Sequence, residues 1–168
     1  NQLSRLTDGN IFKIIFGKLL AYTLLGFIVA IFIFSVVHPL LGIPASEGTL
    51  AFLWVVLLFV MANAMLGIMI STIFKNEAIA MDVSFVYNSP AFVFSGFTFP
   101  MMAMPEFSAW YAQIIPYTHF LNAFLKGVEM NTPSSFLVQP TINLLLFFLV
   151  GYIVTISIFM FRNKKTIV

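Results

Sequence analysis

The sequence predicts an all-α integral membrane protein with four transmembrane helices and an extracellular re-entrant helical hairpin between spans three and four. Of the 168 residues, 61% are hydrophobic and 8% are charged, and the mean hydropathy is +1.03. Soluble domains carry about 25% charged residues, so a soluble fold could not bury so much apolar surface. Cysteine is absent, which excludes disulfides and thiolate metal sites within this sequence.

Four apolar stretches are long enough to cross a bilayer, which takes about 20 helical residues. They cover residues 19–38, 50–74, 79–99 and 141–161. Pro90 lies within the third stretch, where it is expected to kink the helix. Residues 1–18 are predicted to form a cytoplasmic or interfacial lead-in, and residues 19–168 the transmembrane domain. Because the sequence starts at Asn1, we expect a fragment of a longer protein.

The basic residues predict the orientation of the chain. Seven of the eight fall on one side of the predicted spans: Arg5, Lys13, Lys18, Lys75, Arg162, Lys164 and Lys165. The other side carries Glu47, Glu106 and Glu129, with Lys126 as its basic residue. By the positive-inside rule both ends of the chain are expected to be cytoplasmic. The sequence pI of about 9.0 comes from few charges and indicates no nucleic-acid partner.

Residues 100–129 are predicted to form the hairpin, because Pro100, Pro105 and Pro116 divide an apolar stretch into pieces too short to cross. The first helix is expected to start at Pro105 and the second near Thr118. Each has an apolar face at helical spacing, formed by Phe107, Trp110, Tyr111, Ile114 and Ile115 and by Phe120, Ala123, Phe124, Gly127 and Val128. The alternative is an amphipathic loop that lies flat on the outer leaflet.

Polar residues inside the apolar stretches are candidates for a substrate pathway. They are Asn63, Asp82, Tyr87, Asn88 and Ser95. Neutral polar groups can equally hydrogen-bond between helices. Asp82 is a functional candidate because an ionisable group in hydrocarbon is costly, although it could instead reach water or pair with Lys75. His38 and His119 are far apart in the sequence, so no metal site is expected.

Several short motifs occur in a specific order. They are Ser95-Gly96-Phe97-Thr98-Phe99-Pro100, Met104-Pro105, Trp110, Pro116-Tyr117, Phe120 and Lys126-Gly127, with Ile15-Phe16-Gly17-Lys18-Leu19-Leu20 upstream. This order resembles the permease subunits of type-2 ABC exporters. The resemblance implies a six-span permease of which this chain is the last four spans. It also implies a second permease half, a homo- or heterodimer, in a cell membrane, here the bacterial inner membrane.

The resemblance assigns roles to residues as well. The lead-in, with Arg5, Asp8 and Lys13, is expected to couple to a cytoplasmic ATPase. The hairpin, with Pro100, Pro105, Trp110, Pro116, Tyr117 and Phe120, is expected to form the extracellular gate. Gly17-Lys18 is not a phosphate-binding loop, because Leu19 stands where a hydroxyl residue would hold magnesium. ATP and Mg²⁺ are therefore expected on the partner subunit, and no cofactor on this chain.

The predicted function is export of a lipophilic or amphipathic substrate from the cytoplasm by an ATP-driven permease. The alternative is an ion-coupled carrier or channel subunit that uses Asp82. That class is expected to show paired intramembrane charges or repeated broken helices, and the sequence shows no internal repeat. A membrane-embedded enzyme is disfavoured because no cluster of His, Asp and Ser occurs.

Overall fold

The computed structural model describes residues 11–42, 47–96, 103–130 and 133–164, and the regular elements in this part of the chain are all helices, without a strand. Three of its helices are long and apolar enough to cross a membrane, at Phe12–Leu40, Ala51–Ile73 and Ser135–Arg162. The prediction of an all-helical integral membrane protein is thereby confirmed.

The first long helix consists of α2 (Ile11–Phe32), the π-helical turn η1 (Ile33–Val37) and α3 (His38–Leu40). It contains the predicted span 19–38 together with residues 11–18 of the predicted lead-in. Pro39 lacks the N–H that an α-helix would give to residue 35 and crowds that carbonyl. In η1 the His38 N–H instead reaches the Ile33 carbonyl, so the helix continues through the proline by widening one turn.

The second and third long helices are α4 (Glu47–Ile73) and α9 (Val138–Lys164). They pack closely at Gly151 of α9, where an added Cβ would lie 3.1 Å from Met65 Cγ and 3.4 Å from the Met65 carbonyl carbon. On the other side of α4, a Cβ on Gly26 of α2 would lie 2.5 Å from Val60 Cγ1. Two glycines therefore let α2 and α9 approach α4 from both sides, as small residues do between membrane helices.

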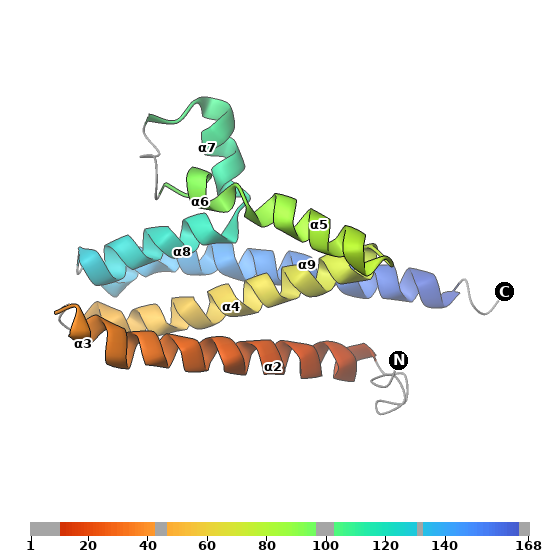
Figure 1. Cartoon of the computed structure of the whole chain (residues 1–168), viewed down its shortest axis with the longest axis horizontal. Coiled ribbons are helices and arrows are strands. Elements are labelled where there is room, and N and C mark those ends of the chain that lie inside the picture. Colours follow the sequence, from red (N-terminus) through yellow and green to blue (C-terminus); the bar gives the residue numbers. More distant parts are fainter. Residues whose placement is uncertain (1–10, 43–46, 97–102, 131–132, 165–168) are drawn as a thin grey trace.

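The long helices lie side by side (Figure 1), with the start of α2 and the end of α9 at the same end of the bundle. Lys13, Lys75 and Arg162 occur near this end, which we call the basic end. The segment 134–137, η4 (Ser134–Leu137), leads into α9 at the opposite end.

The predicted third span is not one continuous helix. It comprises α5 (Glu77–Asn88), capped by the Asn76 side chain, and the short α6 (Ala91–Phe94). They are separated at Ser89 and Pro90, because Pro90 has no N–H to give to the carbonyl four residues earlier and its ring crowds that carbonyl, although both residues keep right-handed helical torsions. The expected kink at Pro90 is thus a break, and residues 97–99 of that prediction lie outside the described residues.

The hairpin region contains α7 (Glu106–Gln113), α8 (Pro116–Phe124) and the π-helical turn η3 (Leu125–Glu129). Two helices separated at Pro116 were predicted, and the second begins at Pro116 itself because a helix needs no N–H from its first residue. α8 lies beside α4 and α9, whereas α5, α6 and α7 extend along the outside of the bundle (Figure 1).

The two predicted apolar faces of the hairpin differ in how far they are buried. Ala123, Gly127 and Val128 of the second face are buried, as predicted. On the first helix, Phe107 and Trp110 are exposed. Periodicity identified an apolar face on α7, but the described residues leave most of it exposed.

Candidate transport site

Helix α8 is held between α4 and α9 by aromatic contacts. The Phe120 ring stacks on Phe59 of α4, with centroids 4.4 Å apart and planes at 23°. Phe124 meets Phe52 edge-on at 5.6 Å. Phe52 is fully buried and also contacts Phe34 of the first long helix at 5.8 Å. One aromatic cluster therefore joins α8 to two long helices.

The start of α8 lies close to the middle of the long helices. Tyr117 contacts Phe59, which is 12 residues after the start of α4 and 14 before its end. His119 contacts Phe147, which is 9 residues after the start of α9 and 17 before its end. At 1.5 Å per residue, these contacts lie about 14–18 Å from the first residue of α4 or α9, and each of these helices is about 40 Å long. The turn between α7 and α8 therefore lies well inside the bundle.

His119 is buried, at 6% exposure, and it is part of a series of hydrogen-bonded polar groups that we call the polar chain. Its Nε2 lies 2.9 Å from the Gln113 carbonyl oxygen at the end of α7. Since a carbonyl can only accept, Nε2 donates, and Nδ1 accepts from Asn143 Nδ2 of α9 at 3.0 Å. Asn143 Oδ1 in turn accepts from Gln139 Nε2 at 3.2 Å. This pattern fits a neutral imidazole and ties α7, α8 and α9 together.

The next carbonyl of the same turn is also bonded by a side chain. Tyr87 Oη of α5 donates to the Ile114 carbonyl oxygen at 2.8 Å. Phe94 of α6 meets Tyr111 of α7 edge-on at 5.6 Å. Side chains from α5 and α8 thus satisfy two carbonyls that the interrupted helix leaves unpaired.

Sequence reasoning missed the role of His119, which was considered only as a metal ligand. A signal was present: a histidine three residues after a proline, in an otherwise apolar helix, can bond the carbonyls that the proline frees. No group of three or more His, Cys, Asp or Glu side chains that could hold a metal occurs within residues that the structure describes.

The five predicted pathway residues lie on three segments. Asn63 of α4 lines a cavity of about 550 Å³ beside α2. Tyr87 joins α5 to α7, whereas Asn88 donates to Ser84 of its own helix at 2.8 Å. Ser95 is buried after α6. Asp82 is exposed on α5 and forms no ion pair with Lys75 or with another residue in the described ranges.

The predicted gate residues divide between two environments. Pro116 is buried and Tyr117 and Phe120 are half-buried against the long helices, whereas Pro105 and Trp110 are exposed. Pro100 lies outside the described residues.

Of the predicted coupling residues, Arg5 and Asp8 lie outside the described residues. Lys13 is exposed near the start of α2 and lines a second cavity, of about 600 Å³, beside Phe148 and Tyr152 of α9.

The long apolar helices define a polytopic membrane protein. Residues 9–129 match the family described as ABC-2 type transporter. The match covers well over half of the chain, which therefore belongs to this family. The predicted resemblance is confirmed.

The chain is also similar to individual proteins of this kind. It is 28% identical over 123 residues to a protein of Escherichia coli K12 named "Probable multidrug ABC transporter permease YbhS", covering 68% of this chain and 32% of that protein. It is 33% identical over 70 residues to "ABC transporter G family member 20" of Dictyostelium discoideum, covering 39% of this chain and 10% of that protein. The chain thus spans about a third of the length of the bacterial relative. No solved structure gives a significant match.

Proposed function

We propose that this chain is part of a permease subunit that exports a lipophilic or amphipathic substrate, driven by a separate cytoplasmic ATPase and paired with a second permease half. The observation that carries this proposal is the family match, which runs from α2 through the hairpin. The name of the bacterial relative, a multidrug permease, supports a lipophilic substrate. The pathway candidates among the described residues are mainly neutral, which fits the same class.

The proposed orientation puts the basic end in the cytoplasm of a bacterial cell, with both ends of the chain on that side. Lys13, Lys75 and Arg162 near this end support the orientation. The chain then crosses four times, with the broken segment of α5 and α6 in the third crossing.

The proposed hairpin enters the membrane from outside and turns back at Pro116. Non-helical backbone at this depth requires protein or water to satisfy its polar groups. His119 and Tyr87 do this for the Gln113 and Ile114 carbonyls, beside the middle of α4 and α9. A loop lying flat on the surface would not need these bonds, so the contacts favour the re-entrant arrangement.

In this proposal α8 is the fixed part of an outer gate and α7 is the part nearer the pathway. Residues 1–18 would transmit motion from the ATPase, with Lys13 as the described coupling candidate. ATP binding on the partner would then shift the equilibrium between two packings of the helix bundle, as coupling between sites requires.

Transport is tested by placing the complete permease and its cognate ATPase in vesicles and measuring movement of a fluorescent amphipathic drug. We expect ATP-dependent movement that disappears when the ATPase carries an inactivating substitution. Absence of ATP-dependent movement across a panel of lipophilic and amphipathic compounds would contradict export. If Asp82→Asn stops transport while the ATPase still turns over, the ion-coupled alternative is supported instead.

Orientation and hairpin depth are tested by single cysteines, which is convenient because this sequence has none. Lys75→Cys and Glu106→Cys, both at exposed positions, should react with a membrane-impermeant maleimide from opposite sides. Tyr117→Cys should be poorly reactive from both sides. Strong labelling at position 117 from outside would support the flat loop.

A further inference from the structure

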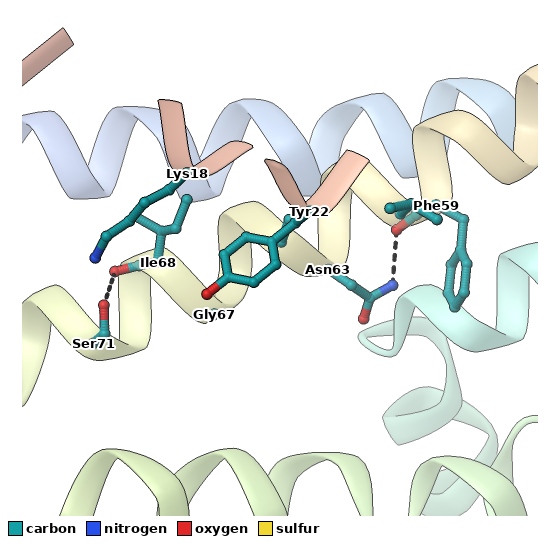
Figure 2. A pocket seen from close by; sticks show the side chains of 9 residues that line it. Lys18, Tyr22, Phe59, Asn63, Gly67, Ile68 and Ser71 are labelled. Atoms are coloured by element: carbon teal, nitrogen blue, oxygen red, sulfur yellow. Dashed lines mark hydrogen bonds between the residues drawn. The ribbon is translucent and has the colours of Figure 1, made fainter. Parts of the chain in front are cut away.

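A groove runs between α2 and α4 toward the basic end (Figure 2), and it corresponds to the 550 Å³ cavity that Asn63 lines. Its lining is contributed by both helices: Lys18 and Tyr22 from α2, and Phe59, Val60, Asn63, Ala64, Gly67, Ile68 and Ser71 from α4. We call it the Lys18 groove.

The groove has the length of one membrane leaflet. Phe59, Asn63, Gly67 and Ser71 recur every four residues and so follow one face of α4. From Phe59 to Ser71 they span about 18 Å at 1.5 Å per residue, against about 15 Å for half of a bilayer's hydrocarbon core. Near Phe59 the groove is limited by the close contact between Gly26 and Val60.

The two ends of the groove differ in polarity. Phe59 and Val60 lie at the inner end, and Lys18 and Ser71 lie at the end nearer the basic end of the bundle. Figure 2 shows the Lys18 amine, the Tyr22 hydroxyl and the Asn63 amide along the same stretch of α4. The lining is thus apolar at one end and cationic at the other.

The polar groups of the groove keep bonding capacity for a ligand. The Lys18 ammonium has no ion pair within the part of the chain that the structure describes. Ser71 donates its hydroxyl proton to the Ile68 carbonyl at 2.9 Å and so has no donor left for an anion, whereas the Tyr22 hydroxyl has no hydrogen bond among the described residues. The negative C-terminal end of the α4 dipole is stabilised by a different cation, because Arg162 Nη2 donates to the Ile73 carbonyl at 3.0 Å.

We propose that the Lys18 groove binds a resident anionic phospholipid, with the phosphate at Lys18 and Tyr22 and one acyl chain along Gly67 toward Phe59. The charge of Lys18 selects an anionic headgroup, and the apolar inner end and the leaflet-scale length fit an acyl chain. Tyr22 is 54% exposed, so the groove opens sideways, where a lipid can enter. This site goes beyond the proposed function, because it binds a membrane component and does not require transport.

Gly67 provides a substitution that fills the groove. An added Cβ at Gly67 would meet no atom within 4 Å, so Gly67→Leu should occupy the path of the acyl chain without disturbing the helices. Gly17 of α2 is equally open and lies outside the lining. Gly17→Leu is therefore a matched control for the gain in helix propensity and apolar surface.

The experiment uses the complete permease without its ATPase, delipidated in detergent and titrated with phosphatidylglycerol or phosphatidylcholine. Native mass spectrometry counts the bound lipids. We expect phosphatidylglycerol to bind about fivefold more tightly, since one lysine near an anionic surface contributes that much. Lys18→Gln should remove this preference, and Lys75→Gln, an exposed lysine outside the groove, should keep it.

Gly67→Leu should lower binding of both lipids at least tenfold, with a melting temperature at or above that of the unchanged protein, and Gly17→Leu should bind like the unchanged protein. Unchanged binding in Gly67→Leu would overturn the proposal. Loss of thermal stability in Gly67→Leu without loss of lipid would also overturn it, because another part of the protein would then fill the groove. In a second measurement the complete permease is placed in vesicles together with its cognate ATPase, and ATP-driven movement of phosphatidylglycerol between the leaflets would identify the lipid as cargo and overturn a resident role.

Discussion

Helices α8 and α5 have similar apolar compositions but are held very differently. In α8, Pro116, Thr118, His119, Leu121 and Ala123 are buried, and the helix contacts both α4 and α9. In α5 no residue is buried, and Met81, Phe85 and Val86 are 74%, 73% and 69% exposed. Among the residues that the structure describes, the bond from Tyr87 to Ile114 is the hydrogen bond that joins α5 to the hairpin.

The difference shows that apolar character alone does not tell whether protein or lipid covers a helix. Lipid tails are as apolar as leucine, so no hydrophobic force drives a membrane helix into its bundle. α8 is placed by ring packing and by the polar chain through His119. Within the described part of the chain, α5 has neither kind of contact with the bundle except the hydrogen bond of Tyr87 in its last turn, so its position is easier to change.

The largest expected effect is at the aromatic cluster that holds α8. Phe52→Ala should lower the free energy of unfolding by about 3–5 kcal/mol, because a fully buried ring is removed. Phe85→Ala, which truncates an exposed ring on α5, should change it by less than about 0.5 kcal/mol. Denaturant unfolding of the complete permease in detergent measures both, and equal losses would contradict the contrast between the two helices.

The next largest loss in the free energy of unfolding is expected when the hydrogen bonds of His119 are removed. His119→Leu keeps an apolar side chain but leaves the Gln113 carbonyl and the Asn143 amide without their partner. Unpaired buried groups cost about 1–3 kcal/mol, and Tyr117→Cys should become more reactive from outside in this background. Asn88→Ala, which removes a bond within α5 only, is the control and should leave labelling unchanged.

The link between α5 and the hairpin should have a smaller effect. Tyr87→Phe deletes one hydrogen bond, worth about 1 kcal/mol, and should increase hydrogen exchange in residues 77–94 while residues 116–124 stay protected. Tyr152→Phe, a tyrosine of α9 for which the structure gives ring stacking only, is the matched control. Increased exchange in both α5 and α8 would mean that the two helices move as one unit.

The smallest effect is expected at Asp82. Its side chain is exposed and has no ion pair among the described residues, so Asp82→Asn should shift the free energy of unfolding by less than about 0.5 kcal/mol. ATP-driven transport should also persist. A loss of several kcal/mol would instead show that a segment outside the described residues provides a partner for Asp82.

The sequence predicted the elements that depend on local chemistry. Long apolar stretches gave the three long helices, and Pro116 marked the junction of α7 and α8. Pro90 was recognised but underestimated, because nothing local shows whether neighbouring helices will support a kink. The contact of His119 with Asn143 could not be predicted, since Asn143 lies 24 residues away on another helix. Likewise, the sequence alone did not show that Asn63 lines a groove with Lys18.

The turn before Pro116 has a mechanical consequence. Its two carbonyls are bonded by side chains of Tyr87 and His119, and not by a helical ladder. A rotation about the χ1 of either residue would release one carbonyl while α7 and α8 keep all their internal bonds. The joint between them can therefore bend for the loss of one or two hydrogen bonds, without any helix having to unwind.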